Sequence, residues 1–363
     1  MIRRRLVLGL AAAACISVCG AAQSDGNAAS YAAVTPDTPL HFPEDYGAHP
    51  QFRTEWWYIT GWLTSSGNRP LGFQITFFRT KPAIDENNPS AFTPHQLLIA
   101  HCAISDPERG RLWQDQKIER AGQTLAEAVV GDTDVHIDSW SLKRDDGVYV
   151  ARIEAGDFSL DLNFTVTQTP LLNGGAGVSR KGPGSEAASY YYSIPHLKVT
   201  GTVGRDRHAE LVSGEAWLDH EWSSEYLDSE AVGWDWAGIN LGDGGALMVF
   251  RIRDAQGRSR WAGGTLRGAD GRVQILDRGD VSFTSQRIWR SPRSAIEYPI
   301  AWTVRAGNRS FALQPLLDDQ ENDTRLSTGA IYWEGAVRAF EQDRLAGLGY
   351  LELTGYGERL RLR

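Results

Sequence analysis

Alternating apolar and polar residues recur in short runs along most of the chain beyond residue 40. The clearest runs are WWYITGWL, LGFQITFFRT, HQLLIAHCAI, FSLDLNFTVTQ, YYYSIPHLKVTGTV, ALMVFRIRD, AWTVRAG and LGYLELTGYG. Turn-forming sequences such as SSGN, DPERG, DDG, GDGG and AGNR separate them. A two-residue period interrupted by such turns is typical of antiparallel strands and hairpins. The pattern therefore predicts an all-β protein with few and short helices.

The series of elements occurs twice along the chain. Trp57 opens a strand, a glycine-containing turn and a second strand ending in arginine, and Trp236 opens the same series. Further matches follow in the same order, separated by loops of different length. A repeat of this size indicates two β-domains of similar topology, which we place at residues 41–210 and 211–363. About seven to ten short strands in each half fit a sandwich or an up-and-down barrel.

The first 22 residues have the composition of a signal peptide. A basic segment, Arg3–Arg5, precedes an apolar run, Leu6–Val18, and a small-residue cleavage site, Gly20–Ala22. The apolar run is too short to span a bilayer as a helix. We therefore assign residues 1–22 to a signal peptide and expect a periplasmic or secreted protein. Residues 23–40 are rich in Ala, Ser, Thr, Pro and Asp and are expected to form a flexible linker.

The cysteines fit this assignment without a disulfide. Cys15 and Cys19 are removed with the signal peptide, unless Cys19 carries a lipid, an alternative that the preceding valine disfavours. Cys102 then remains alone among apolar neighbours and is expected to be a small buried hydrophobic residue. The chain contains no Cys and His spacing typical of a metal site, so we expect no metal.

The mature chain is acidic and rich in aromatic residues. The sequence has a formal net charge of −8, and removal of three arginines with the signal peptide leaves −11. An acidic surface argues against nucleic acid or anionic lipid as the main partner. The 13 Trp, 12 Tyr and 12 Phe residues are suited to lining a cavity for a hydrophobic small molecule.

The segment GEAWLDHEW, just past the middle of the chain, concentrates ionisable residues between tryptophans. If it is a strand, Asp219 and Glu221 face one way, whereas His220 and Trp222 face the other. The three ionisable groups then cannot converge on a metal ion. Two interpretations remain open for His220. It is either a buried histidine hydrogen-bonded to its surroundings, or an ionisable group in an aromatic-walled cavity, where pKa values shift.

Two other segments place tryptophans on strand faces. TEWWYITGWL puts Glu55 and Trp57 on one face and Trp56 and Tyr58 on the other, and GWDWAGINL separates Asp235 from its flanking tryptophans. Such faces are either ordinary core packing or walls for a large apolar ligand. The candidate ligand-binding residues are Trp56, Trp57, Tyr58, Tyr191, Trp234 and Trp236.

Four segments together resemble the AttH-like family, which is related to the lipocalins and includes the carotenoid 1,2-hydratases, also called hydroxyneurosporene synthases. They are HPQFRTEWWYITGWL, YYYSIPHLKVTG, GEAWLDHEW and GWDWAGINL. The resemblance spans roughly residues 41–360 and implies two lipocalin-like antiparallel β-barrel domains in tandem. It also implies cofactor-independent addition of water across an isoprenoid double bond. His220 and Trp222 match the His-x-Trp pair of the hydratases, and Asp219, Glu221 and Asp235 are the carboxyl candidates.

The sequence departs from the hydratases on the strand GALMVFRIRD. Phe250 and Arg251 stand there in place of a Tyr-x-Asp pair. This departure keeps a second function open, a non-catalytic periplasmic carrier of an isoprenoid or lipid working with an ABC transporter. Exposed tryptophans keep a third function open, the binding of a carbohydrate. Both are alternatives to the first hypothesis, a hydro-lyase of the carotenoid 1,2-hydratase type.

Overall fold

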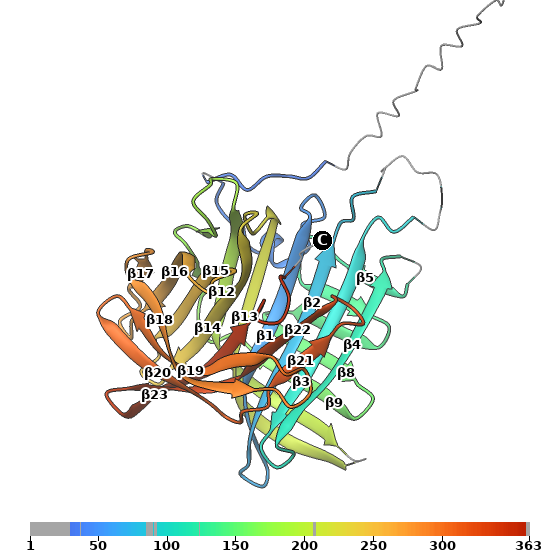
Figure 1. Ribbon diagram of the computed structural model, residues 1–363. Helices are drawn as coiled ribbons and strands as arrows, with labels where there is room; N and C mark the ends of the chain where they lie inside the picture. Colours follow the sequence, from blue (N-terminus) through green and yellow to red (C-terminus); the bar gives the residue numbers. More distant parts are fainter. Residues whose placement is uncertain are drawn as a thin grey trace, which may run out of the picture.

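The computed structural model describes residues 30–360, apart from 37, 85–89, 91–92, 123 and 206–207 (Figure 1). Within these residues the chain forms 23 β-strands and one short 3-10 helix, η1 (Glu44–Tyr46). The all-β prediction is confirmed. No helix among them is long and apolar enough to cross a membrane. The predicted signal peptide, with Cys19, lies outside the described residues.

The first sheet is antiparallel and nearly closes into a barrel, because β3 and β4 approach β5 and β6 at its two ends. Two short strands, β10 (Leu171–Leu172) and β11 (Val178–Arg180), pair with β12 beside the main path. The path itself runs β4 (Arg111–Arg120), β3 (Leu97–Asp106), β2 (Pro70–Thr80), β1 (Thr54–Ser65), β13 (His208–Glu225), β12 (Ala188–Arg205), β9 (Phe158–Thr165), β8 (Val148–Glu154), β7 (Trp140–Asp145), β6 (Asp134–Ile137) and β5 (Ala126–Ala128).

The second sheet repeats this order with fewer strands and curls so that β18 lies against β15 and β16. β21 (Glu321–Thr324) pairs with β22 beside the main path. That path runs β17 (Val273–Leu276), β16 (Ser259–Arg267), β15 (Ala246–Asp254), β14 (Ala231–Leu241), β23 (Arg344–Leu353), β22 (Ala330–Glu341), β20 (Arg309–Pro315), β19 (Glu297–Ala306) and β18 (Val281–Arg290). The prediction of two lipocalin-like antiparallel units in tandem is confirmed.

The repeat also shows where the sheets divide. In each sheet the last strand of the unit, β13 or β23, inserts beside the first, β1 or β14. The segment GEAWLDHEW therefore belongs to the first sheet, and the predicted boundary at residue 210 lies inside its last hairpin. Glu55 pairs with Arg79 in the first sheet, and Asp235 pairs with Arg251 at the same place in the second. Glu55 on β1 and Asp235 on β14 are thus equivalent, and they lie 235 − 55 = 180 residues apart, one more than the separation of Trp57 and Trp236.

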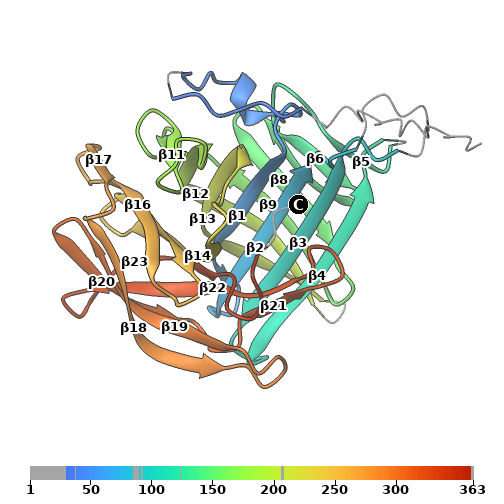
Figure 2. The ribbon, with the colours of Figure 1, turned by 45° about the horizontal axis from the view of Figure 1, so that its top comes forward.

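β1 and the second half of β13, from Ala216, form part of the wall between the two barrels, and both of their faces are largely buried. One face lies in the core of the first barrel, and the other packs against the second sheet through β14 and β23. A strand buried on both faces offers two separate environments to alternate side chains. Figure 2 shows the two sheets leaning together along this seam.

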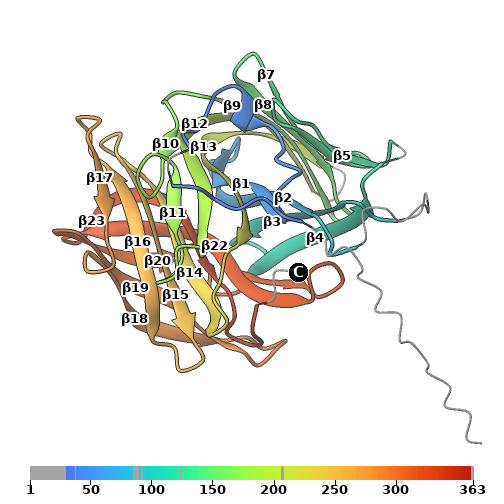
Figure 3. The same ribbon diagram turned by 90° about the horizontal axis from the view of Figure 1, so that it is seen from above.

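The segment before β1 crosses the end of the first barrel, as the view from above shows (Figure 3). Ala32, Val34 and Leu40 pack against the barrel core, and the Ala32 amide donates a hydrogen bond to the Gln51 carbonyl. The indole of Trp57 donates to the Tyr46 carbonyl at 3.1 Å. The described part of the expected linker is therefore docked on the barrel.

Candidate functional site

Strand alternation sends the predicted site residues to opposite sides of the wall between the barrels. His220 and Trp222 point into the first barrel, whereas Asp219 and Glu221 point toward the second sheet. The predicted separation of these side chains is thus confirmed. Each side has its own polar cluster, one around Glu55 and one in a pocket between the sheets.

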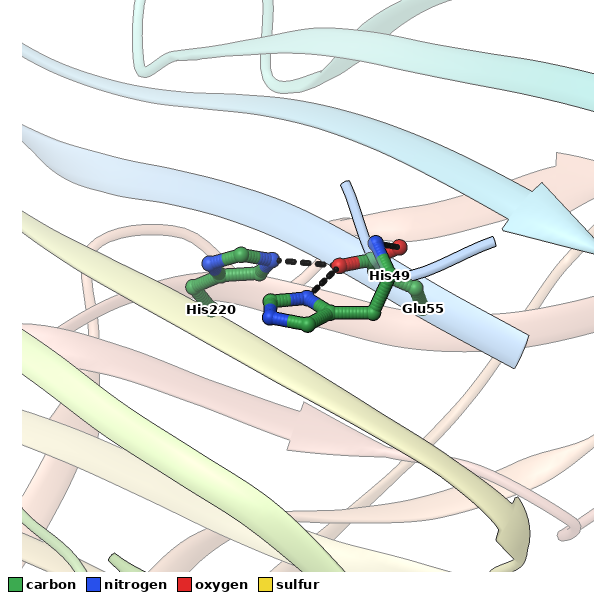
Figure 4. A group of neighbouring side chains, drawn as sticks. All are labelled: His49, Glu55 and His220. Atoms are coloured by element: carbon green, nitrogen blue, oxygen red, sulfur yellow. Dashed lines mark hydrogen bonds and ion pairs between the residues drawn. The ribbon is translucent and has the colours of Figure 1, made fainter. Parts of the chain in front are cut away.

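Glu55 lies inside the first barrel, fully buried, and accepts four hydrogen bonds. Figure 4 shows its contacts with His49 and His220. Its Oε1 accepts from His49 Nδ1 at 2.7 Å and from His220 Nε2 at 2.8 Å. Its Oε2 accepts from the His49 amide at 2.9 Å and from Arg79 Nε at 2.8 Å. We call these four residues the Glu55 cluster. It ties β1, β2 and β13 to the segment that closes the barrel.

The far sides of both imidazole rings are also occupied. The Tyr192 hydroxyl lies 2.9 Å from His220 Nδ1, and Asp45 Oδ1 lies 3.0 Å from His49 Nε2. Trp222 stacks on the His49 ring with centroids 3.7 Å apart. His220 is therefore hydrogen-bonded at both nitrogens, which supports the interpretation of a buried, satisfied histidine.

Charges in the Glu55 cluster balance when Asp45, which contacts His49, is counted with it. Burial alone would raise the pKa of Glu55, but His49 and Arg79 hold it well below its usual value. Burial opposes the charge on His49, yet Glu55 and Asp45 raise its pKa. Burial lowers the pKa of His220, which favours its neutral form. Two cations, Arg79 and His49, thus face two carboxylates.

The donor types in the Glu55 cluster match those of a transition-metal site, since ligand atoms of His49, Glu55 and His220 lie within 4.8 Å of one another. A carboxylate has about four lone-pair sites, and all four on Glu55 already accept N–H groups. The Arg79 guanidinium, which binds one of the same oxygens, would also repel a cation. The Glu55 carboxylate is therefore already saturated by the ionic hydrogen bonds of the cluster itself.

The second cluster lies between the two sheets in a pocket that we call the inter-sheet pocket. Seven predicted residues meet there, and one of the residues of the sequence departure, Phe250, joins them. The lining is Trp56, Tyr58, Gln74, Thr76, Phe78, Lys181, Tyr191, Asp219, Glu221, Tyr226, Leu227, Trp234, Trp236, Phe250, Ile252, Tyr332, Glu334 and Glu352. Its walls are mainly aromatic and its polar groups are mainly carboxyls, the composition of a site for a mostly apolar ligand.

Asp219 lies on the first-sheet side of the inter-sheet pocket and accepts three hydrogen bonds. The donors are the Tyr191 hydroxyl at 2.6 Å, the Ser193 hydroxyl at 2.5 Å and the Trp217 indole at 2.6 Å. Burial nevertheless raises the pKa of Asp219 to about 7. Trp236 donates in turn to the Tyr191 hydroxyl at 3.0 Å, which links this carboxylate to the second sheet.

Two further carboxyls face Asp219 from the second sheet, and the sequence analysis missed both. Glu334 on β22 and Glu352 on β23 are direct cross-strand partners. Burial, followed by repulsion from Glu352, raises the pKa of Glu334 well above its usual value. Burial also raises the pKa of Glu352 to about 7. The available signal was a glutamate inside each of two otherwise apolar strands, IYWEGAV and LGYLELT.

Glu221 differs from the other carboxyls of the pocket because it has a cationic partner. Lys181 Nζ lies 2.8 Å from Glu221 Oε1, and the Ser189 hydroxyl donates to the same oxygen at 2.5 Å. The ammonium also lies over the rings of Phe250 and Tyr191, at 4.3 and 4.7 Å from their centroids. The pocket thus holds one internally paired carboxylate and three carboxyls without a cationic partner among the described residues.

Four of the predicted site residues do not line the pocket, namely Trp57, His220, Trp222 and Asp235. His220 and Trp222 belong to the first barrel, and Asp235 is buried in the second. Asp235 accepts from Arg251 Nε at 2.5 Å and Arg253 Nε at 3.0 Å. It is a second-barrel counterpart of Glu55, and its flanking tryptophans point to the pocket instead.

Two lipocalin-like antiparallel units that pack around an aromatic pocket define the class of this protein. The chain belongs to the AttH-like family, whose model matches residues 33–356. The resemblance seen in the four sequence segments is therefore confirmed.

Three comparisons illustrate the relationship. A crystal structure of a protein assigned as AttH from Nitrosomonas europaea is 52% identical, with a TM-score of 0.85 over 91% of this chain and all of that chain. Kievitone hydratase from Fusarium solani subsp. phaseoli is 26% identical over 249 residues, 64% of this chain and 67% of that protein. The crystal structure of kievitone hydratase from Nectria haematococca shares the fold, with a TM-score of 0.67 and 15% identity over 90% of this chain and 96% of that chain.

Proposed function

We propose that this protein is a hydro-lyase that adds water to, or removes it from, an apolar unsaturated ligand in the inter-sheet pocket. The observation that carries the proposal is the pair of facing carboxyl groups in an aromatic pocket. Glu334 and Glu352 approach from the second sheet, and Asp219 approaches from the first. A pKa near 7, to which burial raises Asp219 and Glu352, suits a carboxyl that must both give and accept protons.

The proposed reaction needs only residues of this chain and water. A protonated carboxyl of the Glu334–Glu352 pair donates its proton to one carbon of the double bond, and the other carbon becomes a carbocation. Aromatic faces such as Trp56 and Trp234 stabilise that positive charge. Water then attacks the cation, and Asp219 accepts the proton that this water loses. The ligand gains one water, and proton exchange with solvent restores both carboxyls.

His220 and Trp222 take a positioning role in this proposal. They lie on β13 beside Asp219 and Glu221 but face the first barrel. The Glu55 cluster fixes the register of β1 against β13, and this register sets the direction in which the pocket residues point. The family relative that is a kievitone hydratase supports hydration as the reaction class.

An activity assay on the purified protein tests the proposal. We would incubate it with kievitone and, separately, with an acyclic carotenoid, and follow the gain of one water by mass spectrometry. Product formation is expected with at least one compound, and Asp219→Asn and Glu334→Gln should each reduce the rate at least about 100-fold. The matched control is Glu297→Gln, which changes an exposed acid of β19.

Two results would count against hydration. One is a folded protein that leaves both compounds and related isoprenoids unchanged. The other is full activity in both pocket variants. Retention of an unchanged isoprenoid or lipid by the protein purified from its native cells would instead favour the exported carrier.

A further inference from the structure

The inter-sheet pocket contains an excess of acidic groups over basic ones. Four carboxyls line it, and Lys181 is the basic residue among the described lining residues. Because Lys181 pairs with Glu221 at 2.8 Å, its charge is already neutralised. Asp219, Glu334 and Glu352 are left to share a largely apolar space without a counter-ion.

Several buried polar atoms of the same pocket have no hydrogen-bond partner within the described chain. They include two acceptor atoms, Gln74 Oε1 and Glu334 Oε1, and the hydroxyls of Tyr58 and Tyr226. All four residues are more than nine-tenths buried and line the pocket. A buried polar group left unsatisfied costs about 1–3 kcal/mol. A ligand that carries N–H or O–H donors would satisfy the two acceptors, of which Glu334 also lies beside the hydroxyls of Tyr58 and Tyr332.

Aromatic rings provide the third element. Trp56 stacks between Tyr226, at 4.6 Å, and Trp234, at 6.3 Å between ring centroids. Ring faces attract cations, most strongly when water is excluded. The Lys181 ammonium already lies over Phe250 and Tyr191, so one ammonium ion is held in this way at the edge of the pocket.

We propose that the inter-sheet pocket binds a hydrophobic ammonium ion, a protonated amine with an apolar body. Its N–H groups reach Glu334 and Gln74, its charge lies against Glu352 and Asp219, and its apolar part lies on the tryptophan faces. This inference uses the same pocket as the proposed function but requires no reaction. It also deepens that function, because an ammonium nitrogen resembles the carbocation that hydration would form.

Binding of the ammonium ion is coupled to proton release. Burial raises the pKa of Asp219, Glu334 and Glu352, so these carboxyls retain protons near neutral pH. A bound cation favours their ionised forms, and protons leave as the ligand enters. The pocket tyrosines stay neutral, because burial raises the pKa of each well above its usual value. These are Tyr58, Tyr191, Tyr226 and Tyr332.

Isothermal titration calorimetry with two matched probes tests this inference. Decylammonium and 1-decanol, each below its aggregation concentration, have the same apolar chain and differ in charge. We expect decylammonium to bind at least tenfold more tightly than decanol at pH 8, and its affinity to rise from pH 6 to pH 8. Titrations in buffers of different ionisation enthalpy should show net proton release only for the amine.

Substitutions in the inter-sheet pocket test which residues are responsible for amine binding. Glu334→Gln combined with Glu352→Gln should weaken decylammonium at least tenfold and leave decanol within threefold, whereas Glu297→Gln should change neither. Circular dichroism confirms that each variant is folded. Equal affinity of the two probes for the unmodified protein, or amine binding without proton release, would overturn the inference and needs no variant. Tight, proton-coupled amine binding by a protein without hydratase activity would instead overturn only the proposed reaction.

Discussion

Glu55 is predicted to be the most sensitive single position for the stability of the first barrel. The change Glu55→Gln keeps the size of the side chain but removes its charge, which leaves Arg79 and His49 buried without their shared carboxylate. Breaking a buried ion pair by removing one partner costs about 3–5 kcal/mol. For a unit of this size each kcal/mol lowers the melting temperature by about 2–4 °C, so a fall of about 6–20 °C is expected.

Thermal unfolding followed by circular dichroism at pH 6 measures this effect, with urea unfolding as a second determination. Asp45→Asn provides an internal comparison, because Asp45 contacts the same histidine but is partly exposed. Its loss should cost about 1 kcal/mol or less. If Glu55→Gln unfolds within 1 kcal/mol of the unmodified protein, the Glu55 cluster does not stabilise the barrel in the way its geometry indicates.

Three further predictions address pH, packing and the pocket. Stability should fall as pH rises from 6 to 8, because burial raises the pKa of Asp219 and Glu352 to about 7 and both lose their bound protons over this range; the raised pKa of His49 acts in the same direction. The fall in melting temperature should be smaller in Asp219→Asn. Gly72→Ala should destabilise the protein by about 1–3 kcal/mol in urea unfolding, because its new Cβ would lie 2.6 Å from the methyl group of Ala336 on the facing sheet. Trp56→Ala should weaken decanol binding about tenfold or more in calorimetry and should also lower the free energy of unfolding, because the indole stacks on Tyr226 and Trp234.

The fold was accessible from the sequence because it depends on local patterns. The two-residue period identified the strands, and the repeat identified two units of the same topology. The unit boundary was missed because a hairpin strand, β13, returns to pair with β1 across most of the first unit. Local pattern carries no information about which distant strand a segment will join.

The site was accessible only in part. Alternation correctly separated Asp219 from His220, and it grouped Trp234 with Trp236 away from Asp235. It could not show that Glu334 and Glu352 would lie opposite Asp219, because those contacts join strands more than 100 residues apart. His49 had no recognisable spacing to Glu55 and His220, since a loop brings it over the barrel end.

The two faces of β1 and β13 place different constraints on amino-acid substitutions in this protein. Substitutions from Asp219 to Trp222, taken one residue at a time, should alternate between altered ligand handling and loss of folded protein. Selection can therefore vary every second residue of these strands to produce new pocket chemistry, while the intervening residues remain constrained by folding. A single residue inserted into one of these strands would turn every following side chain to the opposite face, so that both the pocket and the barrel core would be lost.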